Sequence, residues 1–126
     1  VKTVEMFERL SEKHPEATRK LVEDKANGSA VISTLKKHVT GIVPITPKES
    51  KEARAYAVST LWEAKNVFLP PATATWVDLE FIPELLAFPA SAHDDMVDSM
   101  TQALSDLTKN ARPKIHASNL AYLRRG

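Results

Sequence analysis

Five stretches of the chain repeat apolar residues at helical spacing, with charged residues between them: 1–14, 27–39, 50–65, 76–88 and 91–107. We expect the first helix to end at His14, because the residue before Pro15 is driven out of the helical region. Asn27 or Ser29 can cap the second helix, and Pro83 restricts the middle of the fourth. The pattern therefore predicts five helices.

The apolar positions also predict which side of a helix is buried. The faces are, in chain order, Ala30, Val31, Leu35 and Val39; Ala53, Tyr56, Ala57, Thr60, Leu61 and Ala64; Phe81, Leu85 and Phe88; and Met96, Val97, Met100, Leu104 and Leu107. The last of these stripes is the most regular, which favours a long amphipathic helix over 91–107.

Three short β-rich runs lie between the helices, at 19–24, 41–46 and 66–71. Pro44 confines the second run to a sheet edge or to the end of a strand, because proline has no amide hydrogen for the ladder. Pro70 and Pro71 end the third run. Strands that alternate with helices are typical of an α/β fold in which the strands pair in parallel.

Composition limits the classes of protein that fit this pattern. The chain has 126 residues, the size of one domain, and its 17 Lys and Arg against 16 Asp and Glu give a net charge of +1. This balance predicts no general attraction to nucleic acid or membrane, and no apolar run approaches the roughly 20 residues that span a bilayer. The absence of Cys excludes disulfides and thiolate metal sites. Residues 109–126 hold five bases and no acid, which predicts a basic, flexible tail after a domain over 1–108.

Acidic residues gather at two positions along the chain. Glu23 and Asp24 lie at the carboxyl end of the first predicted strand, the edge at which open α/β sheets place their ligands. Asp94, Asp95 and Asp98 open the last helix, where Asp98 shares a face with either of the others. Acids in a first helical turn are also favoured by the helix dipole alone. Carboxylates from two elements suit hard cations such as Mg²⁺, which in pairs promote phosphodiester hydrolysis.

Four segments resemble, in chain order, the C-terminal part of the nuclease domain of phage terminase large subunits. They are Leu21–Gly28 (LVEDKANG), Ser50–Ala55 (SKEARA), Trp62–Pro70 (WEAKNVFLP) and Glu84–Asp98, which contains ELLAFP and HDDMVD. The resemblance covers about residues 20–108. It implies an RNase H-like fold, with a mixed sheet flanked by helices, of which this chain is a C-terminal portion. It also implies cutting of concatemeric, double-stranded viral DNA during genome packaging, with Mg²⁺ or Mn²⁺ in a two-metal site.

The resemblance assigns roles by position. Glu23 corresponds to the second catalytic acid, and the last would come from Asp95 and Asp98, with Asp94 as the rival; all four carboxylates are candidate metal ligands. The candidate contacts for DNA phosphates are Lys48, Lys51, Arg54, Arg112 and Lys114. For the first three, a solvated helix face is the plainer interpretation. The implied partners are double-stranded DNA and, for the full protein, the portal and the small terminase subunit. The implied location is the cytoplasm of a bacterial host, away from membranes.

Two parts of the family pattern have no counterpart in the sequence. The family's first catalytic Asp lies on a strand before a helix like 1–14, and therefore before Val1, and the glycine-rich phosphate loop of the ATPase domain does not occur. The chain is expected to be incomplete for catalysis by itself and, with strand edges uncovered, to self-associate. One alternative is a non-catalytic remnant that docks or holds DNA. Another is a RuvC-like junction resolvase, whose final motif the Asp95–Asp98 spacing resembles.

Overall fold

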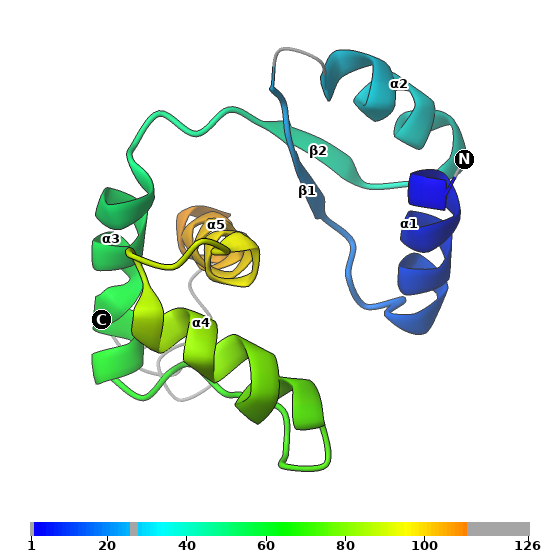
Figure 1. The fold of residues 1–126 in the computed structure, drawn as a ribbon. Coiled ribbons are helices and arrows are strands. Elements are labelled where there is room, and N and C mark those ends of the chain that lie inside the picture. Colours follow the sequence, from blue (N-terminus) through cyan, green and yellow to red (C-terminus); the bar gives the residue numbers. More distant parts are fainter. Residues whose placement is uncertain (1, 26–27, 111–126) are drawn as a thin grey trace, which may run out of the picture. The chain divides into compact units, whose positions relative to one another are not determined.

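The chain divides into two compact units, Val1–Tyr56 and Ala57–Gly126, and the computed structural model describes residues 2–25 and 28–110. The first unit holds α1 (Lys2–Lys13), β1 (Lys20–Glu23), α2 (Gly28–His38) and β2 (Ile42–Ile45), and α3 (Lys51–Glu63) crosses into the second (Figure 1). The second unit continues with the π-helical turn η1 (Val77–Phe81), α4 (Ile82–Ala87) and α5 (Asp95–Asn110). No helix in the described part of the chain combines the length and the apolar surface that a bilayer span requires. Of the predicted tail over 109–126, Lys109 and Asn110 belong to α5, and the other residues lie outside the described part of the chain.

β1 and β2 form a parallel pair joined through α2. The register pairs Lys20 with Ile42 and Glu23 with Ile45. Gly41 precedes β2, and its carbonyl oxygen accepts a hydrogen bond from the Lys20 amide at 2.8 Å, so pairing begins where β1 begins. The first two predicted strands and their parallel direction are therefore confirmed, and the fold class is α/β.

The sheet in the described residues is smaller than the one expected of an RNase H-like domain. It contains β1 and β2, not the larger mixed sheet. Pro44 lies opposite Val22 in this pair, and β2 tolerates it because alternate amides of a strand with one neighbour point away from the ladder. Each strand has one edge with no strand beside it in residues 2–25 and 28–110. The self-association expected from such edges stays a prediction.

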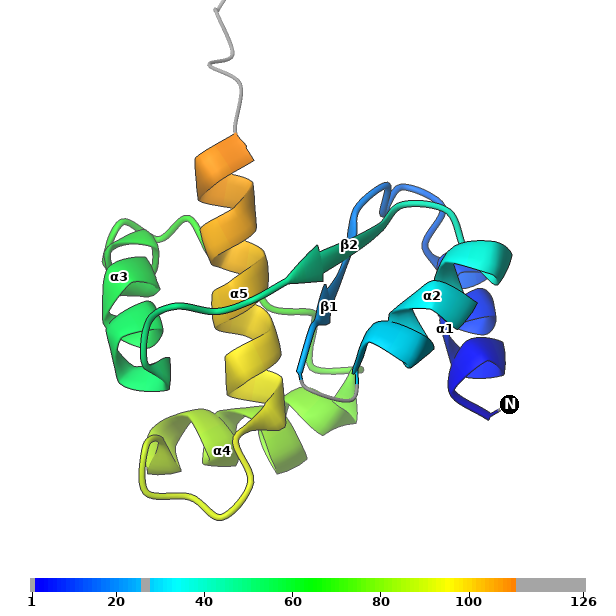
Figure 2. The same ribbon diagram turned by 90° about the horizontal axis from the view of Figure 1, so that it is seen from above.

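An apolar core holds the first unit together. Its buried members are Val4, Ile32, Leu35, Val39 and Ile42, with Phe7 and Val22 packed against them. α1 and α2 lie on the same side of the strand pair (Figure 2), where they supply most of these side chains. Ile32 is buried and Val31 is exposed, which corrects the predicted face of α2. Val31 and Ile32 lie four and three residues before Leu35, so they flank it on opposite sides of the same helix face, and the core packs against the flank that carries Ile32.

Leu35 is the central residue of this core, since its side chain has 0% of its surface exposed. Leu35→Ala is expected to lower the free energy of unfolding of the first unit by about 2–5 kcal/mol, because it leaves a cavity. Urea unfolding followed by circular dichroism measures the loss. Val31→Ala is the matched control, with an expected loss of about 0.5 kcal/mol or less because that side chain is exposed. Equal losses from the two variants would contradict this assignment of the core.

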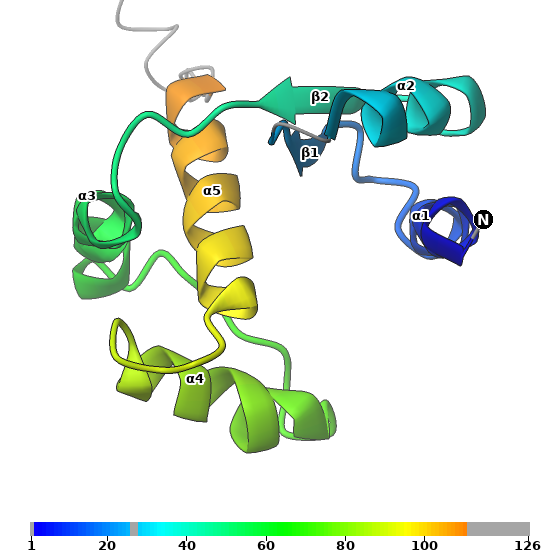
Figure 3. The same cartoon turned by 45° about the horizontal axis from the view of Figure 1, so that its top comes forward.

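The predicted helix over 76–88 forms as two consecutive segments, η1 and α4. Pro83 lies in the first turn of α4, where no amide hydrogen bond is required, so α-helix can begin there. Val77 and Phe81 are buried, and the Trp76 ring lies edge-on to Phe81 with 6.3 Å between ring centroids. α4 runs crosswise to the beginning of α5 (Figure 3). The proline thus divides this helical segment without ending it.

α5 confirms the last predicted helix, although it begins at Asp95. Val97 and Thr101 are fully buried. Thr101 was not on the predicted stripe; its hydroxyl donates to the carbonyl oxygen of Asp98 at 3.0 Å, which makes its burial tolerable. Leu107, which was on the stripe, is 65% exposed, and the buried surface of α5 therefore lies in its first half.

The buried side of α3 differs from the prediction. Arg54 and Val58 are buried, while Tyr56 is 83% exposed. Short alanine side chains occur on several sides of this helix, so their spacing did not identify the side that carries Arg54 and Val58. Ser50 caps the helix as its hydroxyl oxygen accepts from the Ala53 amide at 3.1 Å.

The predicted strand at 66–71 is wrong, because this segment has no regular secondary structure. α3 ends at Glu63, Lys65 just after it has the left-handed conformation at a φ of 57°, and the Asn66 amide donates back to the Leu61 carbonyl oxygen at 2.9 Å. Pro70 and Pro71 have no amide hydrogen. Asn66, Pro70 and Pro71 therefore have no free amide hydrogen to donate to a neighbouring strand. Side chains that favour β-structure do not compensate for this loss.

Candidate functional site

Glu23 lies where the sequence predicts a ligand-binding edge, at the carboxyl end of β1. Its side chain is half-buried, and Lys25 Nζ lies 3.2 Å from its Oε1. Asp24 follows β1 with an exposed side chain, and its amide donates to the Ile45 carbonyl oxygen at 2.8 Å. Of the two acids, Glu23 is the one that is partly shielded from water, and a partly shielded carboxylate interacts more strongly with a cation.

Gly28 allows α2 to begin directly against this acidic strand end. A Cβ atom at this position would lie 3.3 Å from both Asp24 Oδ1 and the Glu23 carbonyl oxygen. The sequence suggests a glycine turn after the acids, and the structure makes Gly28 the first residue of α2. The absence of a side chain therefore brings the positive end of the α2 dipole close to the Asp24 carboxylate.

Asp94, Asp95 and Asp98 surround the first turn of α5, and they differ in exposure. The Asp94 carbonyl oxygen accepts from the Asp98 amide at 2.8 Å. Asp94 and Asp98 are half-buried, whereas Asp95 is exposed. Gln102 Nε2 donates to Asp98 Oδ2 at 3.3 Å, which restricts the direction of that carboxylate.

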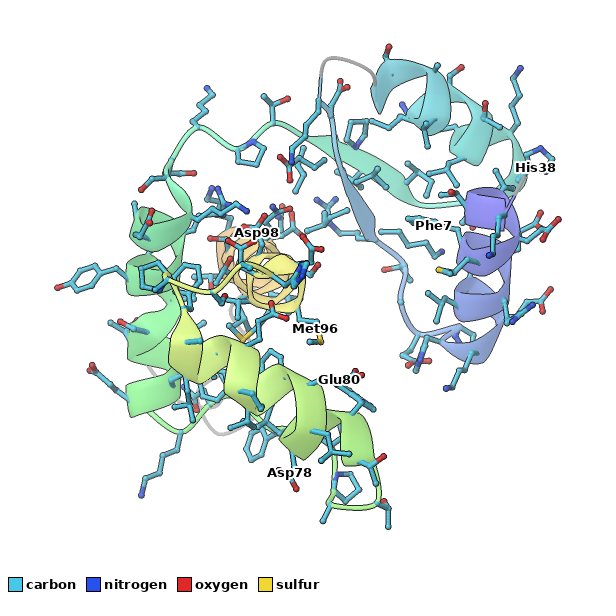
Figure 4. All side chains as sticks on the ribbon, viewed as in Figure 1. Phe7, His38, Asp78, Glu80, Met96 and Asp98 are labelled. Atoms are coloured by element: carbon cyan, nitrogen blue, oxygen red, sulfur yellow. The ribbon has the colours of Figure 1, made fainter. Side chains whose placement is uncertain are left out.

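Asp95 borders an apolar cavity of about 470 Å³ within the second unit. The cavity is lined by Val67, Phe68, Leu69, Trp76, Phe81, Asp95, Met96, Ser99, Met100, Ala103 and Leu104. Asp98 is not among these residues, and Figure 4 shows Asp98 and Met96 projecting from different sides of α5. The structure therefore places Asp95 on an apolar side of the helix, apart from Asp98.

Glu84 is a residue whose role the sequence reasoning missed. Its Oε1 accepts a hydrogen bond from the Val97 amide at 2.9 Å, from α4 to the first turn of α5. The two residues are 13 positions apart, so helical spacing gives no hint of the contact. The available signal is an acidic residue placed in an otherwise apolar short helix just before a helix start.

The candidate DNA-contacting bases separate into three groups. Lys48 and Lys51 are exposed, as expected for side chains that meet phosphates. Arg54 is buried, and its Nη1 donates to the Glu49 carbonyl oxygen at 3.1 Å. Arg112 and Lys114 lie outside the described residues. Lys48 and Lys51 are thus the candidates whose exposure suits a DNA surface.

The acidic side chains are chemically suited to bind a hard divalent cation, because carboxylate oxygens are the ligands that Mg²⁺ and Mn²⁺ prefer. In residues 2–25 and 28–110, no group of three or more His, Asp or Glu side chains is arranged to hold one metal ion. Mg²⁺ ordinarily takes one or two carboxylates together with waters and phosphate oxygens. A Mg²⁺ site of that kind needs only one or two protein carboxylates, which is fewer than the three side chains of such a group.

The chain matches the model of a known protein family. A family model described as "Terminase RNaseH-like domain" matches residues 2–107. The matched range takes in residues 2–56 of the first unit and 57–107 of the second, and it contains Glu23, Asp94, Asp95 and Asp98. No curated protein and no solved structure matches the chain significantly.

Proposed function

Because the chain belongs to the terminase RNase H-like domain family, we propose that it is the portion of a metal-dependent endonuclease that cuts concatemeric, double-stranded DNA during viral genome packaging. The family implies a nuclease in the parent protein. The observation that carries the proposal is the family match over residues 2–107, which includes both acidic positions. In the parent protein, the partners would be the portal and the small terminase subunit, in the cytoplasm of a bacterial host.

Glu23 and Asp98 are the proposed metal ligands, with Asp94 or Asp95 as a further one. Mg²⁺ or Mn²⁺, when bound, would lower the pKa of a water molecule and neutralise charge on the phosphate. Without a cation, these carboxylates repel the DNA backbone. The chain's own contribution is to hold the carboxylates in place: Gln102 restrains Asp98, and Lys25 lies beside Glu23 and would have to share it with the cation.

Lys48 and Lys51 are proposed to bind DNA phosphates. Both side chains are exposed, and each phosphate that a lysine neutralises releases a counterion from the duplex. Affinity for DNA would therefore fall as the salt concentration rises. These contacts position the duplex and do not select a base sequence.

Replacing EDTA by Mn²⁺ is expected to raise the affinity of the whole chain for linear duplex DNA by about fivefold or more, since one favourable charge pair about 4 Å apart contributes about 1 kcal/mol even in water. Glu23→Gln is expected to abolish this rise, because the amide is a poor cation ligand. Glu12→Gln removes an exposed carboxylate of α1 and is expected to preserve the rise. Fluorescence anisotropy of labelled DNA measures the affinity, and gel electrophoresis of the same samples detects cutting.

Two outcomes would contradict the proposal. Equal affinity in Mn²⁺ and EDTA, with intact DNA, would indicate a non-catalytic module that holds DNA. A marked preference for a four-way junction over linear duplex would instead indicate a junction resolvase.

A further inference from the structure

We propose that Glu84 is a positioning residue that anchors the first turn of α5 and thereby determines where the Asp98 carboxylate lies. The anchoring contact lies within the second unit and does not depend on the proposed function. Its consequence for metal binding rests on the proposed function, in which Asp98 is a ligand.

The contact joins two helices that follow each other along the chain. Glu84 lies in α4, and its Oε1 accepts from the Val97 amide of α5 at 2.9 Å. Val97 is the third residue of α5, and its amide is one of those at a helix start that have no partner within the helix. An N-cap side chain commonly accepts from the amide at this position. Here the acceptor is the carboxylate of another helix.

The surroundings make this hydrogen bond stronger than an exposed one. Glu84 is half-buried, and the Val97 side chain is 1% exposed, so the bond is only partly screened by water. A carboxylate is also a charge-assisted acceptor, and a negative charge is favoured at the amino end of a helix. The Phe88 amide donates to the Glu84 carbonyl oxygen at 3.0 Å and closes the last turn of α4. Both the backbone and the side chain of Glu84 are therefore hydrogen-bonded.

Asp98 directly follows the anchored residue. Its amide donates to the Asp94 carbonyl oxygen at 2.8 Å, and its own carbonyl oxygen accepts from the Thr101 hydroxyl at 3.0 Å. These bonds join residues 94–101 into one helical segment. The hydrogen bond from the Val97 amide to Glu84 ties this segment to α4, so its loss would let the segment shift and move Asp98 with it.

The role can be separated from simple stability by comparing two variants of Glu84. Glu84→Ala removes the acceptor, whereas Glu84→Gln keeps an oxygen at the same position and loses only the charge. We expect Glu84→Ala to weaken Mn²⁺ binding by about tenfold, and Glu84→Gln to keep it within about twofold. Electron paramagnetic resonance of free Mn²⁺ measures the affinity of the whole chain. Hydrogen exchange of the Val97 amide is expected to speed up at least about tenfold in Glu84→Ala, with or without metal.

Two further variants serve as controls. Glu80→Ala removes an exposed carboxylate of η1, one turn before Glu84 (Figure 4), and is expected to change neither measurement. Val77→Ala removes part of a buried side chain of η1 and is expected to lower the melting temperature without changing Mn²⁺ affinity.

The outcomes separate the two claims. If Val77→Ala and Glu84→Ala weaken Mn²⁺ binding equally, or if Glu84→Gln loses as much affinity as Glu84→Ala, the positioning role is overturned. If Asp98→Asn weakens Mn²⁺ binding but Glu84→Ala does not, the positioning role alone is wrong. If neither changes the affinity while Val97 exchange speeds up, the proposed metal site is wrong, and the consequence for Asp98 fails with it.

Discussion

Asp98→Asn is expected to weaken Mn²⁺ binding by the chain on the order of 100-fold, whereas Asp95→Asn is expected to weaken it by less than about threefold. The family resemblance makes both aspartates candidates. The structure distinguishes them: Asp98 is half-buried and restrained by Gln102, and Asp95 is exposed beside an apolar cavity. A restrained, partly shielded carboxylate loses less freedom when it binds a cation and is less screened by water.

Titration of free Mn²⁺ by electron paramagnetic resonance measures both affinities under the same conditions. Asp78→Asn removes an exposed carboxylate of η1 (Figure 4) and controls for the change in net charge. Asn has nearly the shape of Asp, so the hydrogen bond from Gln102 has an oxygen acceptor in either variant. Equal losses from Asp95→Asn and Asp98→Asn would show that both carboxylates bind the cation. A larger loss from Asp95→Asn would contradict the assignment to Asp98.

Apolar spacing predicts an element well where large side chains repeat on one side. It places α5 through Val97, Met100 and Leu104, and it identifies Leu35 as a core residue. It fails for α3, where alanines on several sides hide the side that carries Arg54 and Val58. It also fails at 66–71, because a strand depends on available amides and a neighbouring strand, and side-chain type reports neither.

In the candidate site, as in the fold, the sequence predicts features that depend on neighbouring residues but not contacts between distant ones. The order of the acidic motifs locates Glu23 at a strand end and Asp98 in a first helical turn, and the structure places both there. The contact between Glu84 and Val97 spans 13 residues and two helices, so no local pattern contains it. The difference between Asp95 and Asp98 likewise depends on what packs around α5. Sequence therefore identifies the candidate carboxylates, and packing decides which of them are restrained.

Gly41→Ala is expected to destabilise the first unit by about 3 kcal/mol or more. Gly41 has a φ of +77°, a conformation that costs a residue with a side chain about 1–2 kcal/mol. A Cβ atom at this position would also overlap the backbone carbonyl oxygen of Thr18, which cannot rotate away as a side chain can. The Gly41 carbonyl oxygen accepts from the Lys20 amide at the start of β1, so relieving the overlap would disturb the pairing of the two strands.

Native-state hydrogen exchange of the β1 amides measures this loss within the first unit. Gly28→Ala is the matched control, since Gly28 does not have a positive φ and a Cβ there would meet its nearest neighbours at 3.3 Å. One of these neighbours is the movable end of the Asp24 side chain, and alanine is a better helix former than glycine. We therefore expect Gly28→Ala to change stability by less than about 1 kcal/mol. Equal effects from the two variants would show that the left-handed turn at Gly41 is not what holds β1 and β2 in register.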